Sequence, residues 1–148
     1  MFEKKEEKKP VEAIHKKDVN MDGPKPEIMM TPNMTFAFIR KINTPNDVEK
    51  LLFAGERVQC CYATLRDYAV FTDKRVIIRD IQGITGTKVS SLTIPYKAMK
   101  MYSVETSGII GVDADITIWT SVGNINLHLS RNIDTNELCA LIAKEICE

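Results

Sequence analysis

The sequence predicts a mainly β fold with some helix: about seven antiparallel strands in a barrel or sandwich, capped by a C-terminal helix. Between residues 56 and 130, short runs rich in β-branched and aromatic side chains alternate with turn residues, which is the pattern of consecutive strands. After this region, residues 135–147 carry apolar side chains at helical spacing. The chain has 148 residues, of which 44% are hydrophobic, and this suffices for one compact core and excludes disorder throughout.

The charge balance narrows the classes of function. Lysine and arginine together number 20, as do aspartate and glutamate, so the formal net charge is zero. A protein whose main task is to bind nucleic acid or an anionic membrane needs a cationic surplus, so we expect neither partner. No apolar run approaches the roughly 20 residues of a membrane helix, and residues 1–9 lack a secretory apolar stretch. We therefore expect a cytoplasmic protein whose four cysteines are reduced.

Residues 1–43 are expected to form a polar N-terminal extension ahead of a folded domain at residues 44–148. Up to residue 33 the segment contains seven lysines, seven acidic residues and four prolines, without hydrophobic periodicity. Such a composition buries too little apolar surface to offset the chain entropy lost on folding. We interpret the extension as a partly flexible arm, or as a segment that becomes ordered on a partner.

Met34, Phe36 and Phe38 form an alternating apolar set near the end of this arm. The alternation predicts a strand with the three side chains on one face, and a short helix is the alternative. Phenylalanine is costly to expose to water, so we expect these residues to dock on the core or to form oligomer contacts on a neighbouring subunit.

A short helix is expected before the first strand, between Thr44 and Gly55. Thr44 suits the N-cap, Pro45 suits the first helical position, and Asp47 places a carboxylate near the positive end of the helix dipole. Gly55 ends the helix. Its apolar stripe consists of Val48, Leu51 and Leu52.

The seven strands follow in order, separated by turn residues. We expect them at about residues 57–63, 67–71, 75–79, 88–94, 99–106, 114–120 and 124–129. Glycines in the connections at residues 82–86 and 121–123 permit the positive φ values that tight hairpins use. In the fifth strand both faces carry mixed side chains, so the sequence does not decide which face is inward.

Asp134 is expected to open the last helix. It supplies an acceptor at the N-cap, and Glu137 follows three residues later, as in a capping box. One face of the helix is apolar and consists of Leu138, Leu141, Ile142 and Ile146. This face is expected to cover an open end of the preceding sheets.

Four short motifs refine this order of elements. They are residues 67–75 (DYAVFTDKR), 82–88 (QGITGTK), 94–96 (IPY) and 103–106 (SVET). In this order and on these elements they resemble the bacterial pleckstrin-homology-like family, whose fold is two nearly orthogonal sheets closed at one end by a helix. The resemblance covers about residues 44–146 and leaves residues 1–43 outside it.

This resemblance implies a non-catalytic module that self-associates, often into rings, and that has no settled ligand. Because a fold alone does not assign a function, our leading hypothesis is a protein-interaction or scaffold module that forms a symmetric homo-oligomer. Two alternatives stay open. One is a module that binds a lipid headgroup or another small anionic ligand, and the other is a prophage-encoded regulator that acts on a host protein.

The edge of the fifth strand is the candidate site for a protein partner. In related folds an extended peptide adds a strand beside the C-terminal helix, and main-chain hydrogen bonds supply the affinity. The candidate residues are Met99, Met101, Tyr102, Ser103 and Glu105. An edge shielded by Lys97 and Lys100 is the alternative, and the pairing of such edges in a homo-oligomer satisfies both interpretations.

A candidate anion patch consists of Arg75, Arg79, Lys97 and Lys100. Asp73 and Asp80 lie near the two arginines in the sequence, which favours a solvated face of mixed charge instead. Phosphoinositide-binding relatives collect several cations around the first two strands and their loop, where this chain offers only Arg66.

The sequence predicts no catalytic residue, no cofactor and no metal site. His128 is expected to point outward from the last strand, without a nucleophile beside it. Asp113 and Asp115 share a strand face, but no third metal ligand is evident, and the cysteines lack a zinc-binding spacing. The remaining catalytic alternative is a site formed between subunits, for example by His128 and Asp113.

Overall fold

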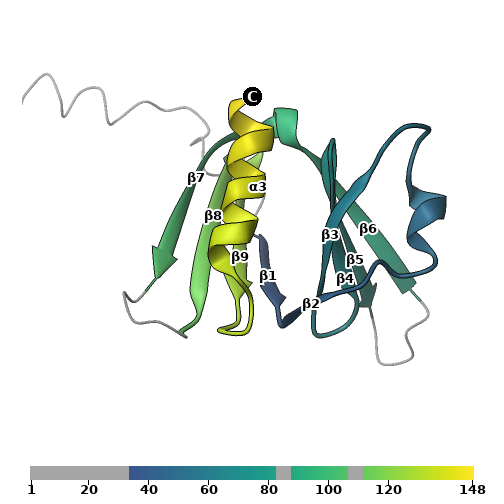
Figure 1. The fold of residues 1–148 in the computed structure, drawn as a ribbon, viewed down its shortest axis with the longest axis horizontal. Helices are drawn as coiled ribbons and strands as arrows, with labels where there is room; N and C mark the ends of the chain where they lie inside the picture. The colour runs from purple at the N-terminus through teal and green to yellow at the C-terminus, as the bar shows by residue number, and fades with distance from the viewer. Residues whose placement is uncertain (1–33, 83–87, 107–111) are drawn as a thin grey trace, which may run out of the picture. The chain divides into compact units, whose positions relative to one another are not determined.

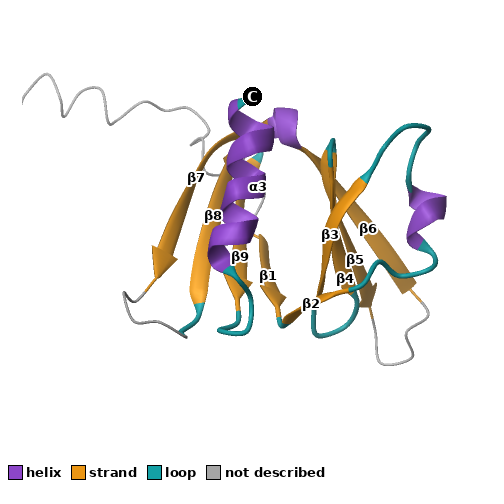
Figure 2. Cartoon of the chain, viewed as in Figure 1, coloured by secondary structure: helices purple, strands orange, loops and turns teal. Residues whose placement is uncertain are grey.

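The computed structural model describes residues 34–82, 88–106 and 112–148. These residues form nine strands, two short 3-10 helices and one α-helix (Figures 1 and 2). In chain order the elements are β1 (Met34–Phe38), β2 (Arg40–Ile42), η1 (Val48–Leu51), β3 (Val58–Ala63), β4 (Tyr68–Thr72), β5 (Arg75–Gln82), β6 (Lys88–Pro95), η2 (Tyr96–Ala98), β7 (Met99–Thr106), β8 (Ala114–Thr120), β9 (Gly123–Leu129) and α3 (Thr135–Cys147). The predicted class, mainly β with a C-terminal helix, is confirmed.

The strands form two separate sheets. One has four strands in the order β1-β9-β8-β7, and the other has five strands in the order β2-β3-β4-β5-β6. The seven strands expected from the sequence are antiparallel within two runs, β3 to β6 and β7 to β9, and β6 does not pair with β7. β1 lies parallel to β9. No ladder in the described part of the chain joins the two sheets, so the fold is a sandwich and not a closed barrel.

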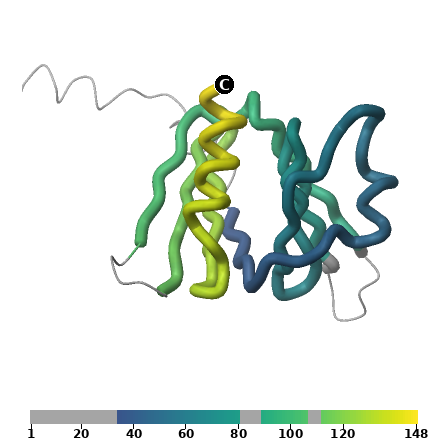
Figure 3. Tube along the Cα trace, in the orientation of Figure 1, coloured from purple at the N-terminus to yellow at the C-terminus, as the bar shows by residue number. Residues whose placement is uncertain are grey.

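The chain passes between the two sheets at two corners, which Figure 3 allows the reader to follow. At the first corner, the Phe38 carbonyl accepts a hydrogen bond from Ser130 N at 3.0 Å, and Ile39 N donates to the Ala63 carbonyl at 2.8 Å. At the second corner, η2 leads from β6 into β7. There the buried Tyr96 hydroxyl donates to the Thr72 carbonyl at 2.8 Å. These bonds hold the sheets together where no strand ladder does.

The main core lies between the sheets, and α3 covers one side of it (Figure 1). The Asp134 carboxylate accepts a hydrogen bond from Glu137 N at 3.2 Å, which is the predicted N-cap. From this start the helix directs Leu138 and Ile142 into the core, where both are fully buried. The predicted capping role of the last helix is confirmed.

A second, smaller core covers the opposite face of the five-stranded sheet. Val48 of η1 is fully buried there against Tyr68, Val70 and Ile77. The helix predicted between residues 44 and 55 is reduced to this single 3-10 turn, with Asp47 at its N-cap and no side-chain cap. The stability of a short helix comes more from packing than from helix propensity. Here the packing of Val48 on the sheet supports a single turn, and the helix ends at Leu51.

Residues 34–42, which the sequence analysis placed in the arm, form β1 and β2 of the two sheets. The reason is the alternating pattern, because it directs Phe38 into the main core. The ring of Phe38 stacks on Tyr62 with centroids 5.5 Å apart, and it meets Phe71 edge-on at 6.0 Å. The remainder of the predicted arm, residues 1–33, lies outside the described residues, as does most of the predicted turn at residues 82–86.

Candidate functional site

β7 is an edge strand of the four-stranded sheet, because it pairs only with β8 in the described residues. Exposure increases after its first residue: Met99 is 5% exposed, whereas Met101 is 55% exposed and Val104 is 39% exposed. Ser103 and Glu105 are also exposed. Strand addition requires such an edge, with free main-chain groups and side chains that no neighbour covers.

The register with β8 determines which face of β7 is inward, a point that the sequence left open. Tyr102 and Val104 lie opposite Ile118 and Ile116, which are both buried, so this face points toward the core. Tyr102 packs against the main core. The outward face carries Met101, Ser103 and Glu105. A register shift between Met99 and Met101 accompanies the change from the buried first residue to the exposed edge.

The candidate arm residues lie on β1 and contact the core of their own chain. Phe38 is 1% exposed, and Phe36 packs against the same cluster as a partly buried residue. Met34 is half-buried at the start of the strand. Of the two predicted destinations, the core is the one that the structure shows, and Phe38 has no surface left for a neighbouring subunit.

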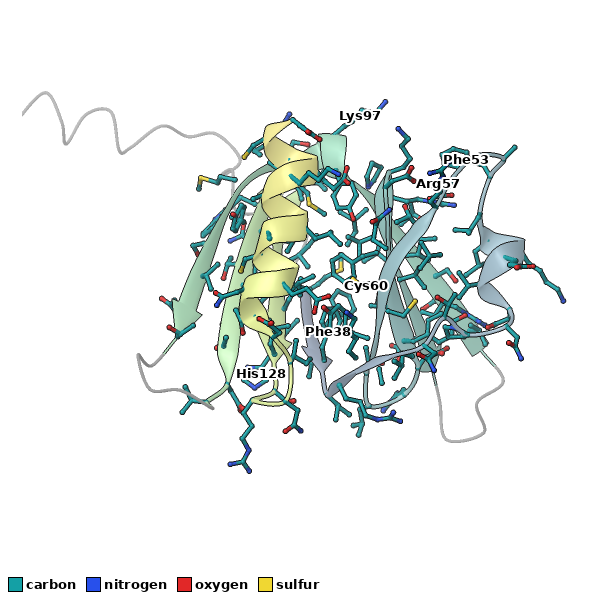
Figure 4. All side chains as sticks on the ribbon, viewed as in Figure 1. Phe38, Phe53, Arg57, Cys60, Lys97 and His128 are labelled. Carbon is teal, nitrogen blue, oxygen red and sulfur yellow. The ribbon has the colours of Figure 1, made fainter. Side chains whose placement is uncertain are left out.

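The four residues of the candidate anion patch divide into two pairs. Arg75 and Arg79 lie four residues apart on β5, and both are engaged by carboxylates. Lys97 on η2 is exposed near the corner between the sheets (Figure 4), and Lys100 on β7 is also exposed. The arginines therefore already have negatively charged partners, whereas the two lysines form no ion pair with any described residue.

Arg75 neutralises a buried carboxylate. Its Nε lies 2.8 Å from Glu56 Oε1, and the Glu56 side chain has no exposed surface. The Thr72 hydroxyl donates to the same oxygen at 2.8 Å. Burial alone would raise the pKa of Glu56, but the hydrogen bonds from Arg75, the Phe53 amide and Thr72 outweigh it, so this pKa is lowered. The pair also anchors the segment around η1, residues 47–56, which we call the η1 segment, since Arg75 donates to the Leu51 carbonyl at 2.6 Å.

Arg79 anchors the other end of the η1 segment. It forms an ion pair with Asp47, and its guanidinium lies 5.2 Å from the centre of the Tyr68 ring. The Tyr68 hydroxyl donates to Asp47 at 2.9 Å, and this bond is the largest cause of the lowered pKa of Asp47. Among the described residues Arg75 forms its ion pair with Glu56, and Arg79 forms ion pairs with Asp47 and Asp67. Asp73 and Asp80, which lie near the arginines in the sequence, form no ion pair with them there.

His128 lies between two carboxylates on the outer face of the four-stranded sheet (Figure 4). Its Nδ1 is 3.0 Å from Asp115 Oδ1, and its Nε2 is 3.3 Å from Asp113 Oδ2. The hydrogen bond with Asp115 is the main cause of its raised pKa. A ring with a carboxylate at each nitrogen is favoured in its doubly protonated form, which is neither a base nor a metal ligand.

This cluster changes two expectations from the sequence. His128 points outward as predicted, and the two residues proposed for a site between subunits, His128 and Asp113, already meet within one chain. His128 is also the third side chain beside Asp113 and Asp115, which the sequence did not reveal. No group of three or more His, Cys, Asp or Glu side chains in the described residues is arranged to hold a metal ion.

The four cysteines are free thiols in different surroundings. Cys60 and Cys61 are buried in β3, Cys139 is partly buried in α3, and Cys147 is exposed at the end of that helix. Burial raises the pKa of Cys60 to about 11. This thiol therefore stays protonated at neutral pH and packs as an apolar side chain.

Comparison with known families decides what this sandwich is. The family model for the bacterial PH domain matches residues 30–146. The chain belongs to the bacterial PH domain family. The match begins before Thr44, so it includes β1 and β2, which the resemblance found from the sequence had left out. No helix in the described residues of this bacterial PH domain has both the length and the apolar composition to cross a bilayer.

Individual relatives agree with this assignment. The PH domain is similar to the crystal structure of a DUF1696 family protein with a pleckstrin-homology domain from Shewanella loihica PV-4. That match has a TM-score of 0.66 and 31% identity, and it covers 72% of this chain and 96% of the other. A pleckstrin homology domain from Shewanella amazonensis SB2B gives a TM-score of 0.56 and 37% identity, with 68% and 82% covered.

A curated relative is the uncharacterized protein YjqA of Bacillus subtilis (strain 168). It is 44% identical over 75 residues, which is 51% of this chain and 60% of YjqA. The match thus spans less than two thirds of that relative. These comparisons establish the fold and the family of this bacterial PH domain.

Proposed function

We propose that this bacterial PH domain is a non-catalytic protein-interaction or scaffold module that assembles into a symmetric homo-oligomer through the edge of β7. PH domains are in general binding modules and not enzymes. The observation that carries the proposal is the free edge of β7, with Met101 55% exposed and Val104 39% exposed. An edge of eight residues with uncovered apolar side chains is a template for pairing with another strand.

The two faces of β7 give the pairing both affinity and selectivity. Main-chain groups along the edge supply hydrogen bonds, while Met101 on the outer face and Val104 on the inner face add apolar contact. Two copies of β7 that pair with each other form a two-fold dimer. If β7 instead pairs with a different edge of the next copy, the same contact repeats from copy to copy and can close into a ring.

Light scattering on the purified full-length protein tests this proposal. We expect an oligomer at micromolar concentration, and we expect the double variant Met101→Lys with Val104→Lys to be monomeric, because charges on an edge oppose strand pairing. Val89→Lys is the matched control, since Val89 is 49% exposed on β6, an edge strand of the other sheet. It should leave the mass unchanged.

The proposal is overturned if the full-length protein is a monodisperse monomer at high micromolar concentration and removal of residues 1–33 does not change this. The deletion stops at residue 33 because residues 34–42 form β1 and β2. A mass that falls equally in the Val89→Lys variant would also contradict it, since the effect would then not be specific to β7.

A further inference from the structure

A trough runs along β1, between this strand and the paired strands β5 and β6. Three adjoining hollows of about 250, 470 and 190 Å³ make up the trough. The first and second hollows share Met34 and Leu92 in their walls, and the second and third share Phe36 and Ile78. The three hollows therefore follow one another along β1 from η2 to the turn between β3 and β4.

The end of the trough near η2 is an apolar pocket. Its walls include Met34, Ile94, Ala98 and Ile125, and Val122, which is 65% exposed, stands at its rim. A hollow of about 250 Å³ with such walls has room for one large apolar side chain. Pockets of this kind hold the anchor residues of many protein interfaces.

The middle of the trough offers unpaired main-chain groups of β1. The Phe38 carbonyl accepts from Ser130 N beyond the end of β9, so the main-chain groups of Phe38 face that strand. Successive residues of a strand direct these groups to opposite sides, so those of Thr35 and Ala37 face away from β9. Ile39 follows the same alternation, because its N–H reaches Ala63. No second strand pairs with β1 in the described part of the chain.

The far end of the trough is charged. Arg66 is exposed and forms no ion pair with any described residue, whereas Arg79 beside it is already bound by Asp47. Asp80 lines the middle of the trough. A peptide that binds along the trough with complementary charge therefore carries an acidic side chain opposite Arg66 and no acidic side chain opposite Asp80.

We propose that this trough binds an extended segment of a partner protein, which adds a strand to the free edge of β1. A large apolar side chain of the segment fills the pocket near η2, and an acidic side chain pairs with Arg66. Met34 adjoins the apolar pocket and Ala37 adjoins the charged end, so a segment paired along β1 places its two anchors about three or four residues apart. The site is distinct from β7, which forms the opposite edge of the same sheet.

Selection of random linear peptides displayed on phage, with the full-length protein as the target, provides the probe. We expect the enriched peptides to carry an apolar residue three or four positions from an aspartate or glutamate. Their binding is then measured as synthetic fluorescent peptides by polarisation. Failure to enrich any such peptide overturns the proposal.

Two pairs of variants locate the binding site. Ala37→Pro removes the N–H that faces the trough and leaves the ladder with β9 intact, so we expect binding about tenfold weaker. Ala37→Ser keeps this N–H and should bind as the unchanged protein does. Arg66→Glu should weaken binding about tenfold, and replacing the peptide's acid by lysine should restore it. Thermal unfolding verifies that each variant is folded.

The outcomes separate this proposal from the one for β7. Binding that survives both Ala37→Pro and Arg66→Glu but is lost in the Met101→Lys, Val104→Lys variant places the peptide on β7 and overturns the trough. If Ala37→Pro does not fold, the charge exchange at Arg66 decides alone. Unchanged binding in Arg66→Glu then counts against the proposal, whatever the oligomeric state.

Discussion

Glu56 depends on Arg75 for its charge, because its side chain has no contact with water. Taking a carboxylate out of water is costly unless its oxygens are paired, and here Arg75, Thr72 and the Phe53 amide share them. The lowered pKa means that the charged form is favoured in the folded state. Stability from this group is therefore full well above pH 4.5 and is lost as the pH falls through the folded-state pKa.

Arg75→Met is expected to lower the free energy of unfolding by about 3 kcal/mol, because it leaves the Glu56 carboxylate buried without its cation. Urea unfolding at pH 7 measures this loss. Arg57→Met is the control: Arg57 is also near the start of a strand, but its side chain is exposed and in no ion pair with the described residues. If both variants lower the free energy of unfolding equally, the buried pair of Arg75 and Glu56 contributes no more to stability than an exposed arginine does.

His128 has the opposite pH dependence. Its raised pKa means that the folded state binds the proton more tightly than the unfolded chain does. The stabilisation is complete below pH 6.5, the ordinary value, and is lost as the pH rises through the folded-state pKa. Two charged groups, Asp113 and Asp115, contact the His128 ring. Across the sheet, Glu105 of β7 lies beyond Asp115, and the strand on the other side of His128 presents the uncharged Ala37.

Stability measured by urea unfolding should therefore fall between pH 5.5 and pH 8.5, by about 0.5 kcal/mol, since the side chains are 40% or more exposed to water. His128→Asn removes the titrating group and should abolish this part of the change. If the variant keeps the same slope between these two pH values, the slope arises elsewhere and the cluster is not its source.

The register explains why the sequence did not reveal this cluster. The sequence predicts a three-residue connection between the last two strands, Ser121 to Gly123, whereas Thr120 pairs directly with Gly123 across a two-residue turn. A two-residue turn at this point sets the hairpin register and places Asp115 opposite His128. Two of the partners of Arg75 and Arg79, Glu56 and Asp47, come instead from the η1 segment. No local pattern encodes a contact between Glu56 and a strand 19 residues later.

At the scale of elements, the sequence predicts best those helices and strands whose signals lie within the element itself. The bounds of α3 agree with the prediction because Asp134 and the apolar spacing act within the helix itself. Strands β3 to β9 were found to within a few residues for the same reason, since alternation and turns mark them. The η1 segment has local helix signals, but its conformation depends on packing against Val70 and Ile77, which the sequence does not show. The trough beside β1 escaped prediction because two separate sheets form it.

Asp134→Ala tests the local part of this argument. Loss of the acceptor for Glu137 N at the start of α3 should lower the free energy of unfolding by about 1 kcal/mol. Asp134→Ser keeps an acceptor at this position and should cost less. Chemical denaturation compares the three proteins. A loss in the serine variant as large as that in the alanine variant would mean that charge, and not capping, is what Asp134 contributes.

For the whole molecule, the sandwich depends on two strands, β1 and β2, that lie before the predicted domain boundary at residue 44. β1 completes the four-stranded sheet and β2 completes the five-stranded sheet, and Phe38 between them is buried in the shared core. Loss of one buried phenylalanine side chain costs about 3–5 kcal/mol, while the stability of a whole domain is about 5–15 kcal/mol. The corner at Ile39 also holds the sheets together through bonds to Ala63 and Ser130.

Removal of residues 1–42 should therefore abolish cooperative unfolding, because it removes both strands and Phe38 together. Removal of residues 1–33 should leave it intact, since every described element begins at or after Met34. Thermal unfolding followed by circular dichroism compares the two truncated proteins with the full chain. The decisive comparison is between the two truncated proteins. If both unfold at the same temperature, the sandwich is complete without β1 and β2. The corner at Ile39 would then have no part in holding the sheets together.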